Sequence, residues 1–245
     1  METTCLTRVF FIISLLCSTC AMAASHHWDY SKGKGGPSHW GGMCQHGAYQ
    51  SPIMINHPLT AQLDNKLAIH YHAVPLVIKN TGHSLKIPAD KENYIEFMGK
   101  RYSLAQFHYH TPSENRVNGK SYPDELHFVN IDKAGNISVL AVFVTPGQSN
   151  TEIQKIIKHI PHKVGALTKT AIKININRLL PTNKHSYYYF KGSLTTPPCT
   201  EGVNWIVMKK PIQASKRQIQ RLQYLFGHNN RPTQPAHNRI ILSTG

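Results

Sequence analysis

The tripeptide His-Tyr-His occurs twice in the 245-residue chain, at residues 70–72 and again at residues 108–110. Both copies lie in short apolar segments that predict β-strand, and in a strand the two histidines of each copy share one face. Histidine is the commonest metal ligand in proteins. Two histidines are too few on their own, because a catalytic zinc site uses three protein ligands and keeps a fourth position open.

A third histidine is within reach of the second copy only. Residues 124–130 (Asp-Glu-Leu-His-Phe-Val-Asn) predict another strand, and the connection to it contains the turn pair Asn118-Gly119. The two strands can therefore lie antiparallel and place His127 opposite His108 and His110.

Polar residues that could hold the imidazoles also distinguish the two copies. Gln106 lies two residues before His108, and Glu125 lies two residues before His127, so each shares a face with its histidine. A metal-bound imidazole needs an acceptor on its other nitrogen, which fixes its tautomer and direction. The first copy has alanine and valine in the equivalent places. The second copy therefore predicts a metal site, and the histidines of the first are interpreted as surface or interface residues.

Two other interpretations of the second copy remain. The three histidines could be hydrogen-bonded core residues without a metal. His108, His110 and Glu114 also match the H-x-H-x3-E signature of cupins. Cupins, however, place glycines six residues before the first histidine and seven after the glutamate, whereas the glycines here are Gly99 and Gly119. A second cupin motif is missing, which disfavours that alternative.

The elements that must position these residues are mostly strands. Between residues 67 and 145 the chain is a series of short apolar runs separated by turn signals, and strand patterns return at 187–194 and 202–210. Helical spacing appears at 151–160 and at 215–226, where Ser215 is a candidate N-cap. With 40% hydrophobic residues and no internal repeat, the chain predicts a single mostly β domain with peripheral short helices.

The N-terminus is typical of a cleavable secretory signal. Arg8 precedes an apolar run from Val9 to Leu16, and Ala21-Met22-Ala23 provides small residues at a cleavage site. We expect a signal peptide at residues 1–23 and a mature domain at 24–245. The apolar run is too short for an anchor, so we expect an exported, periplasmic or secreted protein without a membrane span.

Export also bears on the cysteines, because Cys5, Cys17 and Cys20 leave with the signal. The mature chain keeps Cys44 and Cys199, and two cysteines in an oxidising compartment predict one disulfide. Such a bridge would stabilise the fold by roughly 4–5 kcal/mol through loop closure. The alternative is a pair of buried free thiols.

The formal net charge of +15 raises the question of nucleic acid. Lysine and arginine are scattered along the chain, and no nucleic-acid-binding motif accompanies them, so we expect no nucleic-acid partner. A basic surface aids solubility and attracts small anions.

Several segments besides the histidine motifs occur in the order of one known family. They are His-Trp-Asp-Tyr at 27–30, 50–53, 106–115, 125–130, 192–199, 204–212 and 230–235. On these motifs the mature chain resembles the α-class carbonic anhydrases, in particular the exported bacterial type. The resemblance implies a central, largely antiparallel twisted sheet and reversible hydration of carbon dioxide to bicarbonate, with hydrolysis of activated esters as a side reaction. It also implies a Zn²⁺ cofactor, attack by a zinc-bound hydroxide and, as in many exported relatives, a possible homodimer.

The resemblance also implies roles for individual residues. His108, His110 and His127 match the zinc ligands, and Gln106 and Glu125 match the residues that orient the first and third of them. Thr195 matches the residue that orients the hydroxide, and Glu114 matches the acceptor of the Thr195 proton. His83 matches the proton shuttle. Thr196 matches the residue that faces bicarbonate, and Tyr30 matches a residue that orders water. The matching apolar wall for carbon dioxide is Val129, Val139, Leu194, Val203 and Trp205. Cys44 and Cys199 match the disulfide of exported members.

Two residues depart from the family pattern. Asn115 replaces the histidine that usually follows Glu114. We expect this replacement to affect the rigidity of the site. Lys86 adds a cation near the expected water network, where it could lower the pKa of His83 or of zinc-bound water.

Two further hypotheses belong to other classes. Some carbonic anhydrase-like domains are non-catalytic binding modules, but these typically lack a ligand histidine, and this chain retains all three. After cleavage at Ala23, the sequence Ala24-Ser25-His26 could bind copper or nickel through a free amino terminus, although a solvated tail is the simpler interpretation.

Overall fold

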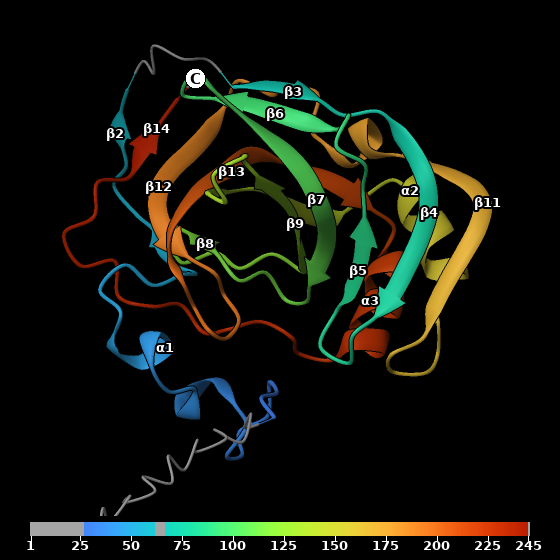
Figure 1. Cartoon of the computed structure of the whole chain (residues 1–245), viewed down its shortest axis with the longest axis horizontal. Coiled ribbons are helices and arrows are strands. Elements are labelled where there is room, and N and C mark those ends of the chain that lie inside the picture. The colour runs from blue at the N-terminus through green and yellow to red at the C-terminus, as the bar shows by residue number, and fades with distance from the viewer. Residues whose placement is uncertain (1–26, 62–66, 245) are drawn as a thin grey trace, which may run out of the picture.

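A strongly curved β-sheet dominates the molecule, and helices α2 and α3 lie beside the strands at one end of it (Figure 1). The structure, a computed structural model, describes residues 27–61 and 67–244. The predicted signal peptide at 1–23 and the sequence Ala24-Ser25-His26 lie outside the described residues. Within them, no helix is long and apolar enough to cross a membrane.

Strands make up most of the elements. The strands are β1 (Met54–Ile55), β2 (Leu59–Thr60), β3 (Ala68–His70), β4 (Ala73–Asn80), β5 (Leu85–Pro88), β6 (Tyr94–Phe97), β7 (Lys100–His110), β8 (Arg116–Val117), β9 (Asp124–Ile131), β10 (Ile137–Pro146), β11 (Leu167–Asn175), β12 (Tyr187–Ser193), β13 (Glu201–Ala214) and β14 (Leu242–Ser243). The helices are α1 (Met43–His46), α2 (Thr151–Lys158), α3 (Lys216–Phe226) and two 3₁₀ turns, η1 (Pro37–His39) and η2 (Ile176–Leu179).

Among the described residues, twelve strands form one sheet in the order β11-β4-β5-β7-β9-β10-β13-β12-β14-β2, with β3 and β6 attached beside β7. Most neighbours are antiparallel, while β10–β13 and β14–β2 are parallel. The predicted mostly β domain with a largely antiparallel sheet is confirmed. Its main core lies on the face away from the histidines, where Phe107, Tyr109 and Phe128 are buried.

Strands β7 and β9 pair as the sequence predicts. They are antiparallel, with His108 opposite His127 and Phe107 opposite Phe128. A slip of one residue would turn the aromatic side chains out of the core, so burial fixes the register and with it the facing of the histidines.

The first His-Tyr-His copy is only partly in a strand, so the predicted strand over all three residues is wrong. Strand β3 ends at His70. Tyr71 is buried, and its hydroxyl donates to Oδ1 of Asn130 at 2.8 Å. The backbone N–H of His72 donates to Asn93 Oδ1 instead of a ladder partner. Both histidines of this copy are exposed, as predicted.

Helices α2 and α3 have well-defined N-termini. Ser215 caps α3 in a capping box with Gln218, which confirms the predicted N-cap. Asn150 caps α2 by accepting from the backbone N–H groups of Glu152 and Ile153. The Gln218 side chain also donates to the backbone carbonyl of Asn150 at 2.8 Å, which joins the two helix starts.

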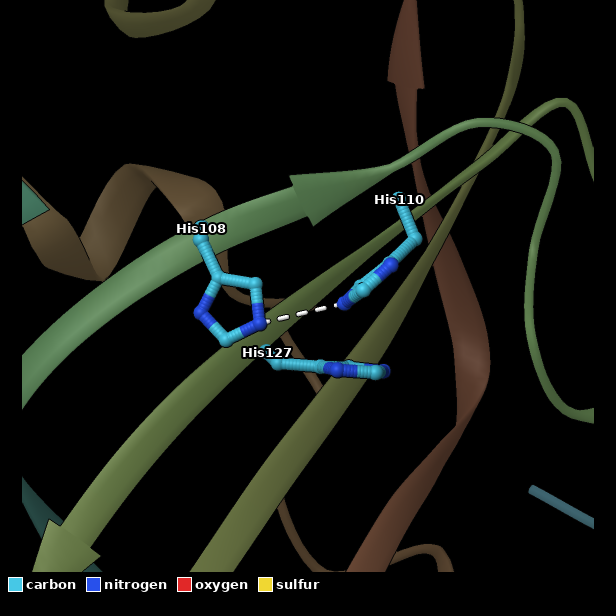
Figure 2. A group of neighbouring side chains, drawn as sticks. All are labelled: His108, His110 and His127. Atoms are coloured by element: carbon cyan, nitrogen blue, oxygen red, sulfur yellow. Dashed lines mark hydrogen bonds between the residues drawn. The ribbon is translucent and has the colours of Figure 1, made fainter. Parts of the chain in front are cut away.

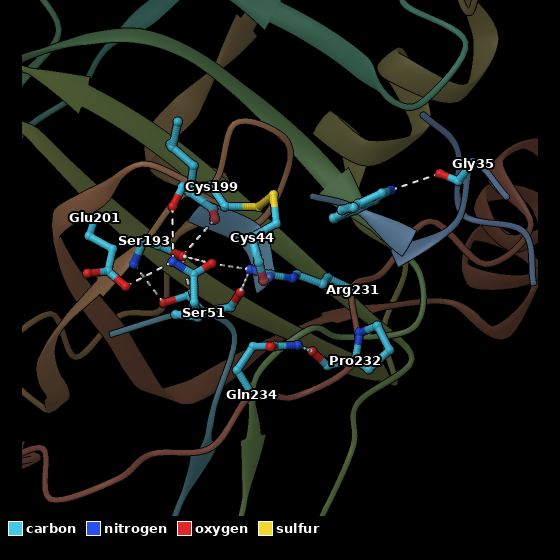
Figure 3. The surroundings of a disulfide bond; sticks show 12 residues. Gly35, Cys44, Ser51, Ser193, Cys199, Glu201, Arg231, Pro232 and Gln234 are labelled. Carbon is cyan, nitrogen blue, oxygen red and sulfur yellow. Dashed lines mark hydrogen bonds between the residues drawn. A yellow bond between two sulfur atoms is a disulfide. The ribbon is translucent and has the colours of Figure 1, made fainter. Parts of the chain in front are cut away.

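The disulfide joins Cys44 to Cys199, as the cysteine count and the resemblance predict (Figure 3). The side chain of Arg231 is buried beside it. Its guanidinium donates to the carbonyl oxygen of Cys44 at 2.6 Å, to that of Ser51 at 2.7 Å and to Gln50 Oε1 at 2.8 Å. Helix α1, the segment that precedes β1 and the C-terminal segment thus meet at Arg231.

Candidate metal centre

Three imidazoles point toward one another on the concave face of the sheet (Figure 2). His108 and His110 come from β7, and His127 comes from β9. One nitrogen from each histidine lies within 4.8 Å of the others, and the Nε2 atoms of His108 and His110 are 3.1 Å apart. A tetrahedral metal with bonds of about 2.0–2.1 Å would hold its ligands about 3.4 Å apart, which this pair approaches.

The outward nitrogen of each ring faces an oxygen. Nδ1 of His108 lies 2.9 Å from Gln106 Oε1, and Nε2 of His127 lies 3.1 Å from Glu125 Oε1. These contacts agree with the facing predicted for Gln106 and Glu125. Because Gln106 Oε1 only accepts, the His108 ring carries its proton on Nδ1 and presents the lone pair of Nε2 inward. Nε2 of His127 lies close to Glu125 Oε1 without a hydrogen bond to it.

Nδ1 of His110 donates to the backbone carbonyl of Asn229, at 2.7 Å. No residue pattern could have indicated this contact, because every residue has a backbone carbonyl. The Asn229 side chain is itself fixed, because it accepts from the backbone N–H of Thr111 at 2.8 Å and donates to the carbonyl of Tyr109 at 3.0 Å.

Burial keeps His108 and His110 neutral. It lowers the pKa of His108 and His110 well below 6.5, and repulsion from the neighbouring imidazoles lowers both further. Metal ligands must be deprotonated, so these rings are ready to bind. Three converging lone pairs repel one another in a buried site unless a cation lies between them. The donor set therefore fits a divalent metal that prefers imidazole nitrogen.

Asn115 holds Glu125 in place, although the family usually has histidine there. The Asn115 amide donates to Glu125 Oε1 at 2.8 Å, and the backbone N–H groups of Glu114 and Asn115 donate to Oε2, each at 2.8 Å. The amide oxygen of Asn115 accepts from the backbone N–H of Ile53 at 3.2 Å. With Asn115 in this position, both carboxylate oxygens of Glu125 therefore accept hydrogen bonds.

The carboxyl of Glu114 is buried beside the histidines. Its Oε1 accepts from the backbone N–H of Arg231 at 2.8 Å, and its Oε2 has no hydrogen-bond partner among the described residues. Burial raises the pKa of Glu114 to about 7, while the charge of His127, the Arg231 N–H and the nearby Thr195 hydroxyl lower it. A bound divalent cation adds positive charge nearby and favours the ionised form.

A cavity of about 220 Å³ opens over the histidines. Its lining includes Val129, Val139, Leu194 and Trp205 on the apolar side, and Tyr30, His83, Thr195 and Thr196 among the polar residues. Val203 does not line the cavity. It is 1% exposed and packs in the same hydrophobic cluster as Trp205.

His83 lies at the rim, in the turn between β4 and β5 directly after Gly82, whose φ is +84°. Its ring stacks on Trp28, with centroids 3.8 Å apart, and His27 is 5.5 Å away. Burial lowers the pKa of His83, and the charges of His27 and Lys86 lower it further against the opposing effect of Asp29.

Comparison with known proteins gives one consistent family. The family profile described as "Eukaryotic-type carbonic anhydrase" matches residues 35–245. A carbonic anhydrase of Pectobacterium atrosepticum is 38% identical over 242 residues, which cover 95% of this chain and 98% of the relative.

Two solved structures are also similar. The α-carbonic anhydrase of Thermovibrio ammonificans, in complex with the inhibitor sulfanilamide, is 43% identical with a TM-score of 0.83, covering 88% of this chain and 98% of that one. The α-carbonic anhydrase of Photobacterium profundum is 41% identical with a TM-score of 0.83, covering 88% and 99%.

Proposed function

The chain belongs to the α-type (eukaryotic-type) carbonic anhydrases, and from this premise we propose that Zn²⁺ is the metal with which His108, His110 and His127 support the reversible hydration of carbon dioxide. The convergence of three imidazoles on one point carries this proposal. When bound, zinc supplies a Lewis acid that lowers the pKa of water to about 7, for which carbonic anhydrase is the standard example. The family membership and the intact triad leave no support for a cupin or a non-catalytic module.

Removal of the metal tests this proposal. We expect one zinc per chain by mass spectrometry, and carbon dioxide hydration in stopped flow that a chelator abolishes and added zinc restores. Activity that survives complete removal of the metal would contradict the proposal.

Thr195 and Glu114 orient the nucleophile. The Thr195 hydroxyl lowers the pKa of the Glu114 carboxyl, and Oε2 of Glu114 is free to accept its proton. With that proton directed at Glu114, the Thr195 oxygen would accept a proton from the nucleophile at the metal centre and leave the nucleophile's lone pair to face carbon dioxide. Glu114 must be ionised to accept, and the positive charge of the metal centre supports that state.

Carbon dioxide is apolar and gains little from polar contacts. The apolar side of the cavity holds it beside the metal, through Val129, Val139, Leu194 and Trp205. Thr196 lies on the polar side and faces the bicarbonate that forms, while Tyr30 orders the water that connects the centre to His83.

His83 carries the proton out of the cavity. It can accept a proton only when neutral, so its lowered pKa extends its working range to more acidic pH. We expect the kcat of hydration to fall as the pH drops through the pKa of His83, with a midpoint below the unperturbed value of about 6.5.

Replacement of His83 separates proton transfer from the chemical step. In weak buffer we expect His83→Ala to lower kcat about tenfold and to leave kcat/KM nearly unchanged, because proton export follows bicarbonate release. Imidazole buffer should restore kcat. His185→Ala, an exposed histidine in a loop, serves as control. An equal loss of kcat and kcat/KM in His83→Ala would contradict the shuttle role.

The mature enzyme is exported and begins at residue 24. The Cys44–Cys199 bond and the signal-like residues 1–23 support this, since disulfides persist in oxidising compartments. The mass of the protein recovered from the periplasm or medium would test the cleavage site. A homodimer stays a prediction of the resemblance, which light scattering would test.

A further inference from the structure

A row of facing residues runs from the metal ligands across the sheet. His127 pairs with His108, and the antiparallel register of β5 and β7, in which Ile87 pairs with Phe107, brings Lys86 opposite His108. On the next strand, Lys79 pairs with Lys86. Facing residues of neighbouring strands project from the same side of a sheet. Lys86 and Lys79 therefore lie on the same face as the ligand histidines.

This face continues as a cationic surface toward the sheet edge. Lys169 of β11 pairs with Val77, which is two residues from Lys79 and so shares its face. Lys79, Lys86 and Lys169 are exposed, and their side chains have no ion-pair partner among the described residues. Strands β4, β5 and β11 contain no aspartate or glutamate. The positive charges of this row are therefore uncompensated.

Lys86 also belongs to the cavity. It lines the cavity together with Ser84, Gln106 and His108, and no carboxylate is among the lining residues that the structure describes. Burial is the main cause of the lowered pKa of His108 and His83, and the positive charge of Lys86 is a smaller cause for both. The ammonium charge thus acts inside the cavity as well as at its mouth.

A small carboxylate is the ligand class that this charge pattern suits. We propose that Lys86 and Lys79 select for small substrates that carry one carboxylate, with Lys86 holding that carboxylate while the reacting carbon lies at the metal centre. This rests on the proposed function, because the metal centre performs the reaction. A cleft lined by one sign of charge concentrates counter-ions. Since charges are screened over about 8 Å at physiological salt, Lys86 acts more strongly than Lys79, and Lys79 more strongly than Lys169.

Carbon dioxide hydration is a poor test of this preference. The equilibrium constant of the reaction fixes the ratio of kcat/KM for hydration to kcat/KM for dehydration, so a variant changes both by the same factor. Activated esters can report this preference, since their hydrolysis is effectively irreversible. In this reaction water adds to the ester carbonyl, the ester C–O bond breaks, 4-nitrophenolate leaves, the acyl group becomes a carboxylate, and the two protons of the water pass to buffer. Neutral 4-nitrophenyl acetate and anionic mono-4-nitrophenyl succinate form a matched pair of probes, and the readout is the ratio of their kcat/KM values.

For Lys86→Gln at low ionic strength, we expect the ratio of anionic to neutral ester to fall about threefold to tenfold. Lys86→Arg keeps the charge and should keep the ratio, and Lys79→Gln should lower it less. Lys133→Gln removes the same charge from the exposed turn between β9 and β10 and should leave the ratio unchanged. Roughly 0.5 M salt should remove the difference between Lys86→Gln and the wild type.

Acetate affinity provides a readout that needs no catalysis. The dissociation constant of ¹³C-acetate, measured by NMR on the zinc-loaded protein, should rise about threefold to tenfold in Lys86→Gln. An unchanged acetate affinity, an unchanged ester ratio, or an equal effect of Lys133→Gln would each overturn the proposal. Loss of hydrase activity in the wild type would count against the proposed function instead, and the acetate measurement would still decide the role of the lysines.

Discussion

The variant His108→Ala is expected to lose stoichiometric zinc and to lower kcat/KM for carbon dioxide hydration by at least about 10³-fold. Two histidines would remain, which leaves the metal without the third ligand that a catalytic zinc site uses. His108 is also the least buried of the three ligands, so its truncation disturbs the core less than that of His110 or His127. Metal content by mass spectrometry and stopped-flow hydration measure the two effects.

The other His-Tyr-His copy provides the matched control. His70 belongs to an identical tripeptide, but it is exposed and stacks on Tyr94 instead of facing other histidines. His70→Ala should keep one zinc per chain and wild-type kcat/KM. Full zinc content and activity in His108→Ala, or an equal loss in His70→Ala, would show that the metal does not lie between the three imidazoles.

Removal of the disulfide should have the second large effect, this time on stability. Cys44 and Cys199 are 155 residues apart in sequence, and releasing a loop of that length lowers the free energy of unfolding by about 5 kcal/mol through the entropy of the unfolded chain. The double variant Cys44→Ser, Cys199→Ser should therefore shift the urea transition to much lower concentration. Zinc binding adds its own stabilisation, so the comparison needs a fixed free zinc concentration or metal-free protein.

Reduced wild-type protein is the control for the substitution itself. If loop closure is the cause, reduction and double substitution should give the same free energy of unfolding within about 1 kcal/mol. A double variant that unfolds at the wild-type urea concentration would contradict the expected role of the bond. Arg231 donates to the backbone carbonyl oxygen of residue 44, so this hydrogen bond can form in the reduced wild type and in the double variant alike.

The strands of the metal centre could be predicted because alternation in a strand fixes the facing of each residue. With two histidines and Gln106 at alternate positions, and Glu125 two residues before His127, the local pattern alone indicates which side chains meet. The register that joins the two strands then follows from burial of Phe107 and Phe128.

What the sequence pattern did not indicate depends on contacts between distant segments. The acceptor for His110 is a backbone carbonyl at Asn229, 119 residues away. His72 leaves the strand because a side chain, Asn93, replaces its ladder partner. Strand β11 was not expected, because as an edge strand it is mostly exposed and shows little apolar alternation.

Val203 illustrates the same limit for the apolar residues. Its burial is compatible with core or cavity, and only the three-dimensional packing, in which Val203 joins the cluster of Trp205 and is not among the cavity-lining residues, decides between them. Val129, Val139, Leu194 and Trp205 do line the cavity.

The buried guanidinium of Arg231 has a consequence for biosynthesis. The guanidinium donates hydrogen bonds to Cys44, Gln50 and Ser51, which leave the ribosome early. The backbone N–H of Arg231 donates to the carboxylate of Glu114. Translation must therefore pass codon 231 before the Glu114 carboxylate gains that partner. A nascent chain stalled or truncated upstream of this codon would carry all three histidines and still lack a finished active centre.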